Sequence, residues 1–169
     1  MFKLRFPASQ LLIWAEHYYI ENDREIEFVL SPNVHKQGYL TQFEFVQICR
    51  WKTPRSRKMA ASNNAEYIEA VTRSALSTEN ERLRIEILTL LNGVSWPTAS
   101  VILHFCHSDP YPILDYRALW SLGVNISDVT YNFDLWWEYT KICRNLALQN
   151  NLSMRELDRA LWQYSKENQ

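Results

Sequence analysis

Two segments of this 169-residue chain carry the same helix-start pattern, and this feature most limits what the chain can fold into. Thr41-Gln-Phe-Glu44 and Ser153-Met-Arg-Glu156 both have the form of a capping box, in which the first and last side chains satisfy each other's free backbone N–H groups. Apolar residues flank both boxes at the positions of a hydrophobic staple. Each segment therefore predicts the start of a helix. The first predicted helix runs to about Trp51 and is stopped by Pro54.

Apolar residues recur at intervals of three and four along most of the remaining chain, as they do on one face of a helix. One short apolar run, residues 26–30, is followed by Ser-Pro-Asn and predicts a strand. The fold class predicted is all-α: a compact multi-helix domain of about eight helices that spans residues 1–169. The further predicted helices cover residues 11–19, 64–75, 79–91, 95–106, 116–122 and 133–148. The third carries Leu83, Ile87, Leu90 and Leu91 on one face, and the fourth has Ser95 as its N-cap.

The composition agrees with one folded domain. The chain is 47% apolar and 22% charged, which excludes a disordered tail, and its length suffices to bury a core without disulfides. The longest apolar runs are far below the roughly 20 residues that a membrane-spanning helix needs. The first residues, MFKLRFPASQ, lack the apolar core of a signal peptide. We therefore expect a soluble, cytoplasmic protein with no membrane partner.

The cysteine and histidine spacing argues against cofactor and metal chemistry. Cys49, Cys106 and Cys143 lie 57 and 37 residues apart and form no C-x-x-C pair, which predicts three buried, reduced thiols and no iron–sulfur cluster. His104 and His107 are three residues apart on a helix end, but two histidines do not complete a tetrahedral metal site. The three glycines are isolated, so no phosphate loop or dinucleotide fingerprint is present. The sequence predicts neither a metal nor a cofactor.

One short segment is strongly basic although the chain as a whole has a formal charge of −1. Residues 50–58 read RWKTPRSRK, with five cations and no acid, so any nucleic acid would be held by this local patch rather than by the average charge. Cations beside an indole suit phosphate contact combined with base stacking. A solvated helix end, with one tryptophan filling the core, is the open alternative. The DNA-binding candidates in this segment are Trp51, Arg55, Arg57 and Lys58.

A second segment, LNGVSWPTASVIL at residues 91–103, is followed by a proline-rich loop and then by Ile-Leu-Asp115. It resembles the helix-hairpin-helix DNA glycosylase superfamily, whose hairpin reads L-P-G-V-G-x-K-T-A-x-x-x-L and precedes an aspartate about 18 residues after the lysine position. Here Pro97 occupies the lysine position and Ser95 replaces the second glycine, while Asp115 keeps the spacing. The residues that match the hairpin are Leu91, Gly93, Val94, Thr98, Ala99 and Leu103.

The resemblance implies DNA binding and removal of a modified base. Backbone N–H groups around Gly93, Val94 and Ser95, at a tight turn and a helix start, offer donors to a phosphate. In the family the aspartate stabilises positive charge on the sugar as the base departs, or activates the attacking species, which makes Asp115 the catalytic candidate. The family lysine attacks the sugar, so Pro97 implies water as nucleophile and a monofunctional enzyme.

Two other residues are assigned roles on weaker grounds. Lys52 is a candidate substitute for the missing catalytic amine, supplied from elsewhere in the fold. Arg117 stands two residues after Asp115 and is placed to orient that carboxylate or to contact phosphate. The sequence leaves open which base would be released and what the oligomeric state is.

Each of these interpretations has an alternative. An aspartate at a helix start is a standard N-cap, and a glycine turn between two helices is an ordinary αα-corner. The chain therefore also fits a non-catalytic DNA-binding or regulatory protein on the same scaffold. A helical protein-interaction domain that binds no nucleic acid is the third possibility, in which the basic segment only aids solubility.

Overall fold

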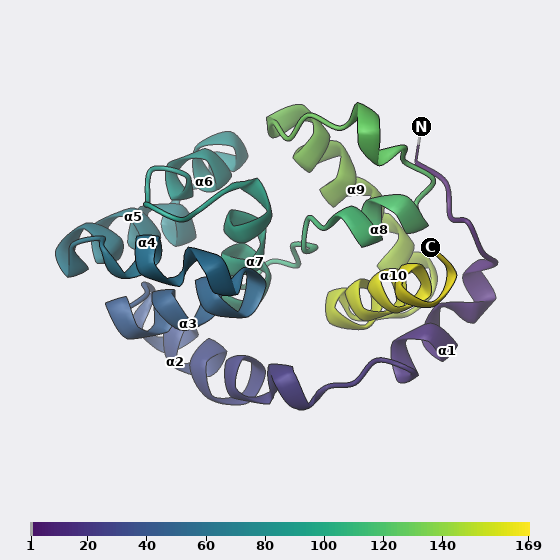
Figure 1. Ribbon diagram of the computed structural model, residues 1–169, viewed down its shortest axis with the longest axis horizontal. Helices are drawn as coiled ribbons and strands as arrows, with labels where there is room; N and C mark the ends of the chain where they lie inside the picture. Colours follow the sequence, from purple (N-terminus) through teal and green to yellow (C-terminus); the bar gives the residue numbers. More distant parts are fainter. Residues whose placement is uncertain (1) are drawn as a thin grey trace. The chain divides into compact units, whose positions relative to one another are not determined.

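The computed structural model describes residues 2–169, apart from the side chains of Asn22 and Asp128. The described residues form helices joined by short loops and no strand, so the all-α prediction is confirmed. They gather into two compact units (Figure 1). Unit 1 consists of residues 2–20 and Pro110–Gln169, and unit 2 of Glu21–Asp109. A single glycosylase-like domain over residues 1–169 stays a prediction.

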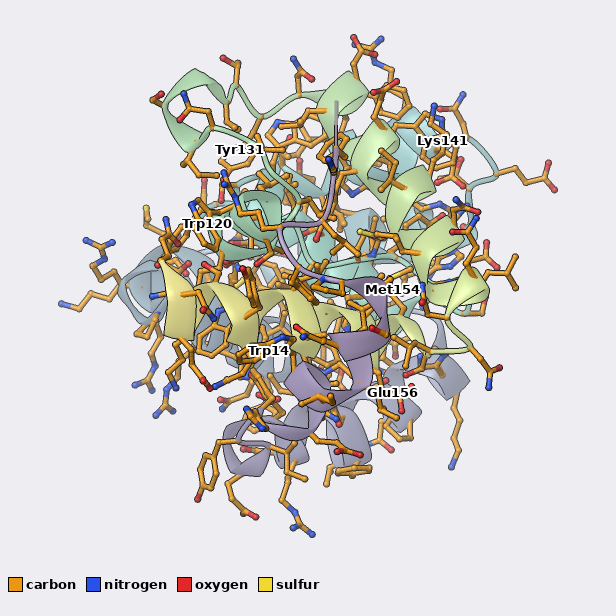
Figure 2. All side chains as sticks on the ribbon, turned by 90° about the vertical axis from the view of Figure 1, so that its right-hand side faces the viewer. Trp14, Trp120, Tyr131, Lys141, Met154 and Glu156 are labelled. Atoms are coloured by element: carbon orange, nitrogen blue, oxygen red, sulfur yellow. The ribbon has the colours of Figure 1, made fainter. Side chains whose placement is uncertain are left out.

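Unit 1 combines the N-terminal segment of the chain with its last helices. The short α1 lies along α10, drawn in purple and yellow in Figure 1. Trp14 on α1 meets Tyr164 on α10 edge to face at 5.3 Å, and Figure 2 shows Trp14 beside the yellow helix. The fully buried Trp136 and Tyr139 of α9 add to this core. The elements of unit 1 are η1 (Ala8–Gln10), α1 (Leu11–Glu16), α8 (Tyr116–Ser121), η5 (Ile126–Asp128), α9 (Phe133–Gln149) and α10 (Met154–Asn168).

Helix α10 begins at the capping box predicted from the sequence. Glu156 accepts hydrogen bonds from the backbone N–H and the hydroxyl of Ser153, both at 2.7 Å, and the Ser153 hydroxyl accepts the Glu156 N–H at 3.2 Å. These bonds favour the charged carboxylate and lower the pKa of Glu156. The start of α10 therefore depends on the ionised form of this side chain.

This dependence predicts a pH effect on stability. Because the folded pKa of Glu156 is depressed, its contribution is present above the unfolded pKa of about 4.3 and is lost as pH falls through the folded value. We expect Glu156→Gln to flatten the decline in unfolding free energy below about pH 5. Urea unfolding at several pH values measures this. Glu79→Gln, at an exposed carboxylate with no described cationic partner, should leave the decline unchanged, and an equal effect of both variants would contradict the assignment.

Unit 2 holds the basic segment and the hairpin. Helix α3 starts at the other predicted capping box, in which Glu44 accepts from the Thr41 N–H at 2.8 Å, and it ends at Lys52, before Pro54. The elements of unit 2 are η2 (Glu21–Asp23), η3 (Ile26–Leu30), α2 (Ser31–Gln37), α3 (Gln42–Lys52), η4 (Pro54–Ser56), α4 (Arg57–Ala61), α5 (Ala65–Ser77), α6 (Glu81–Leu88) and α7 (Trp96–Cys106). The described part of the chain thus holds more helices than the eight or so predicted, and the basic segment continues into η4 and α4.

The predicted strand at residues 26–30 is wrong. These residues form a π-helix that leads into α2, a helix the sequence did not predict. Pro32 has no N–H with which to close an α-helical bond to Phe28, and the Ser31 N–H reaches back to the Ile26 carbonyl instead. An apolar run of five residues fits a strand and a buried helical turn equally well by periodicity.

Two predicted helices also differ in detail. The helix predicted at residues 11–19 ends at Glu16, so Tyr18 and Tyr19 lie beyond it rather than on its apolar face. In α6 the buried residues are Arg84, Ile85 and Leu88, whereas Leu83 and Leu90 are 48% and 60% exposed. The predicted apolar face is therefore covered at Leu91, which is 2% exposed, but not at Leu83 or Leu90. The Arg84 guanidinium donates to the Ala75 carbonyl at 3.1 Å, and this bond makes its burial tolerable.

The three cysteines are buried and form no disulfide, as predicted. Burial raises the pKa of the Cys49 thiol to about 12 and also raises that of Cys106 and Cys143, so none is a thiolate near neutral pH. No helix in the described part of the chain has the length and apolar character needed to cross a bilayer.

Candidate functional site

The turn between α6 and α7 forms a tight corner. Gly93 has a φ of +84°, and the Val94 N–H donates to the Leu91 carbonyl at 3.1 Å. Ser95 takes the N-cap position of α7 as predicted, but its side chain makes no capping hydrogen bond. The backbone N–H groups of Ser95 and Trp96 donate to no other described residue. The start of α7 therefore presents donors to an incoming acceptor.

This turn lies directly against the basic segment. A Cβ placed on Gly93 would come within 3.0 Å of the Ala60 nitrogen and 3.2 Å of the Ser56 oxygen, so the two backbones are in contact. Asn63 locks the arrangement, because its side chain accepts from the Asn92 N–H at 2.8 Å and donates to the Asn92 carbonyl at 3.0 Å. We call residues 50–61 together with 91–96 the hairpin–basic region.

Four of the five cations in this region are exposed. Among the described residues, none forms an ion pair with Arg50, Arg55, Arg57 or Lys58. The other arginines of unit 2 are paired with glutamates; Arg73, for example, meets one a helical turn away at 2.6 Å. The hairpin–basic region therefore carries positive charge that its own chain does not neutralise.

Trp51 is anchored within unit 2. Its indole N–H donates to the buried Asp23 at 3.0 Å, and its ring meets Phe105 edge to face at 5.4 Å. The side chain is half-buried, and its predicted stacking on a base stays a prediction. Lys52, the last residue of α3, is also half-buried.

Asp115 is the N-cap of α8 in unit 1. One carboxylate oxygen accepts the Arg117 N–H at 2.9 Å, and the side chain is half-buried. Asp115 therefore caps α8, as the alternative interpretation of this residue predicts. The Arg117 guanidinium lies 5.1 Å from the centre of the Tyr116 ring and 5.5 Å from that of Trp162 on α10. Lys52 belongs to unit 2, and the idea that it supplies an amine for the chemistry of Asp115 stays a prediction.

Sequence reasoning missed two residues near these candidates. Burial, together with the negative charge of Asp115, raises the pKa of Tyr131, which places this tyrosine in the electrostatic field of the carboxylate. Asn63 joins the hairpin to α4. Tyr131 lies in a loop and Asn63 in a polar run, and neither belongs to a motif, so the sequence contains no signal that would have singled them out.

His107 is bonded within the protein: its Nε2 lies in hydrogen-bond contact with the Arg84 guanidinium. Among the residues the structure describes, no three His, Cys, Asp or Glu side chains lie close enough together to share a metal ion.

Comparisons with known proteins give one structural likeness. No protein-family model and no curated protein matches this sequence. The chain is similar to the Methanocaldococcus jannaschii 8-oxoguanine glycosylase/lyase, solved in complex with a 15-mer DNA containing 8-oxoguanine. The two are 21% identical, the TM-score is 0.46, and the match covers 95% of this chain and 88% of the other.

Proposed function

We propose that this protein binds duplex DNA through the hairpin–basic region. The proposal rests on the contact between the Gly93 turn and the backbone of residues 56–60. This contact brings the backbone N–H donors at the start of α7 close to Arg57 and Lys58, which are exposed and have no described acidic partner. Phosphates are bound by both kinds of group, and neither reads base sequence. Such a surface positions a protein on DNA without selecting a sequence.

We further propose that the protein removes a modified base, with Asp115 as the catalytic carboxylate. This rests on the spacing between the hairpin and Asp115, which matches that of the helix-hairpin-helix glycosylases. In the reaction the bond between C1′ and the base nitrogen breaks, its electron pair leaves with the base, and a water oxygen bonds to C1′ while a proton lost from that water ends on the released base. A nearby carboxylate favours the positive charge that develops on the sugar. Pro97 in place of the family lysine supports water as the nucleophile.

A panel of duplex oligonucleotides tests this activity. Each duplex carries one oxidised, deaminated or alkylated base, and abasic sites are scored after incubation. Base release from any duplex supports the enzyme, and absence of trapped covalent complex with borohydride supports a water nucleophile. Trapping that disappears in Lys52→Ala would instead assign the amine to Lys52. Duplex binding without base release would favour the non-catalytic alternative, which the capping role of Asp115 also fits.

The hairpin–basic region gives a prediction about salt dependence. A triple variant in which alanine replaces Arg55, Arg57 and Lys58 should bind duplex DNA more weakly. The slope of log K for DNA binding against log salt concentration should fall by about 2 to 3, one for each lost phosphate contact. Fluorescence anisotropy between low and physiological salt measures this slope.

A matched control removes three exposed cations of unit 2 that lie outside the region. The triple alanine variant at Lys36, Arg73 and Arg82 changes the net charge equally. If both triple variants lower the slope to the same extent, binding depends on overall charge and the proposed region is wrong.

A further inference from the structure

The N-terminal segment of unit 1 binds the end of α8 that lies opposite Asp115. The Lys3 N–H donates to the Leu122 carbonyl at 2.8 Å, and the Arg5 N–H donates to the Ser121 carbonyl at 2.9 Å. The Arg5 side chain adds a third bond, from Nε to the Trp120 carbonyl at 2.6 Å. Three successive carbonyls at the end of α8 are thus bound by one short segment, residues 3–5, which we call the N-terminal strap.

The strap supplies what α8 lacks by itself. The last carbonyls of a helix have no partner within the helix, and a helix of six residues is too short to be stable alone. Arg5 also lies over the Trp120 ring at 4.5 Å, which fixes its guanidinium in place (Figure 2 labels Trp120). Packing against α10 buries the side of α8. The Val124 and Gly123 N–H groups bind the Leu119 and Trp120 carbonyls. The strap binds the Ser121 and Leu122 carbonyls beyond them and adds a second bond at Trp120.

The chain makes room for the strap at Gly123. This residue has a φ of +79°, and a Cβ there would lie 2.9 Å from the Lys3 carbonyl oxygen, closer than a side chain tolerates. The strap also contacts α10: the Tyr164 hydroxyl donates to the Arg5 carbonyl at 3.4 Å, and the adjacent Phe6 packs on Tyr164 with ring centroids 4.2 Å apart. The strap therefore contacts both α8 and α10.

We infer that the N-terminal strap, with Arg5 as its main side chain, is a positioning element for Asp115. Because α8 spans less than two turns, a shift at its carbonyl end moves its N-cap as well. Arg5 does not act on the substrate; it sets where the carboxylate points by holding the helix that carries it. The catalytic part of this inference rests on the proposed function, whereas the structural part does not.

The hydrogen bond from the Arg117 N–H to Asp115 reports the position of the carboxylate without any substrate. We expect Arg5→Ala to speed amide exchange of Arg117 by about fivefold or more, measured by NMR hydrogen exchange. Arg5→Lys, which keeps the charge over Trp120, should restore part of the protection. Lys141→Ala, which removes an exposed cation of α9 in the same unit (Figure 2), should leave exchange unchanged.

The activity readout separates positioning from binding. On a panel duplex from which the wild type releases a base, Arg5→Ala should lower the single-turnover rate by about tenfold or more while the Kd for that duplex stays within about twofold. A rate loss explained by weaker DNA binding, or an unchanged rate, would overturn the catalytic positioning.

A second variant tests the strap without changing Arg5. Gly123→Ala presses a Cβ against the Lys3 carbonyl oxygen, in addition to the backbone strain of alanine at a φ of +79°, and should also give faster exchange of Arg117. Unchanged Arg117 exchange in both variants would overturn the inference entirely. If the wild type releases no base from any duplex, the proposed function fails, and the exchange measurement alone still decides whether the strap holds Asp115.

Discussion

Asp115→Asn is expected to slow base release by about 100- to 1,000-fold, because it removes the negative charge that would stabilise the developing cation on the sugar. DNA affinity should change by less than about twofold, since the phosphate contacts proposed here lie in the hairpin–basic region of unit 2. Single-turnover kinetics with the panel duplexes, together with anisotropy titrations, measure the two quantities separately.

The substitution isolates charge from structure. Asparagine caps a helix about as well as aspartate does, so the bond to the Arg117 N–H and the start of α8 should survive. Asp134→Asn provides the control, because it removes an exposed carboxylate from the first turn of α9 in the same unit. Unchanged turnover in Asp115→Asn would leave Asp115 as a cap only and would favour the non-catalytic alternative.

Tyr131 gives an independent check on that variant. The pKa of Tyr131 is raised first by burial and then by the charge of Asp115, so removing the charge should lower it part of the way toward its ordinary value. NMR titration of labelled tyrosines follows this change. It confirms that the carboxylate occupies the described place even in a protein that shows no base release.

Helix starts were predictable because their signals are local. The boxes that begin with Thr41 and Ser153 each depend on hydrogen bonds within four residues, and both are present. Asp115 at the head of α8 follows from the same chemistry. The π-helix at residues 26–30 and the exposure of Leu83 and Leu90 were not predicted, because tertiary packing decides which apolar residues are covered.

The candidate site was predictable residue by residue but not as an arrangement. The hairpin and the basic segment were separate predictions, about 35 residues apart in sequence, and no local pattern indicates that they touch. Their contact is possible because Gly93 has no side chain, and the Asn63 amide stabilises it by donating to the Asn92 carbonyl and accepting from the Asn92 N–H. The same holds for the strap, which joins residues 3–5 to the end of α8. Such long-range contacts are fixed only in the folded chain.

Gly93→Ala is expected to lower the free energy of unfolding by about 2 to 4 kcal/mol, through two costs that add. An alanine at a φ of +84° is strained by its own backbone, and its Cβ would meet the Ala60 nitrogen and the Ser56 oxygen at 3.0 and 3.2 Å. Both contacts are with backbone, which cannot turn aside as a flexible side chain would. Urea unfolding gives the stability change, and duplex binding should weaken as the turn is pushed away from the basic segment.

Gly38→Ala separates the two costs within the same protein. Gly38 has a similar φ of +75°, but a Cβ there would meet nothing within 4 Å, so this variant should lose only the backbone term of about 1 kcal/mol. Its DNA affinity should match that of the wild type. The difference between the two variants measures how tightly the hairpin is seated on the basic segment. Equal losses of stability would show that the close approach at Gly93 contributes nothing, and unchanged binding in Gly93→Ala would show that the two parts need not lie together to hold DNA.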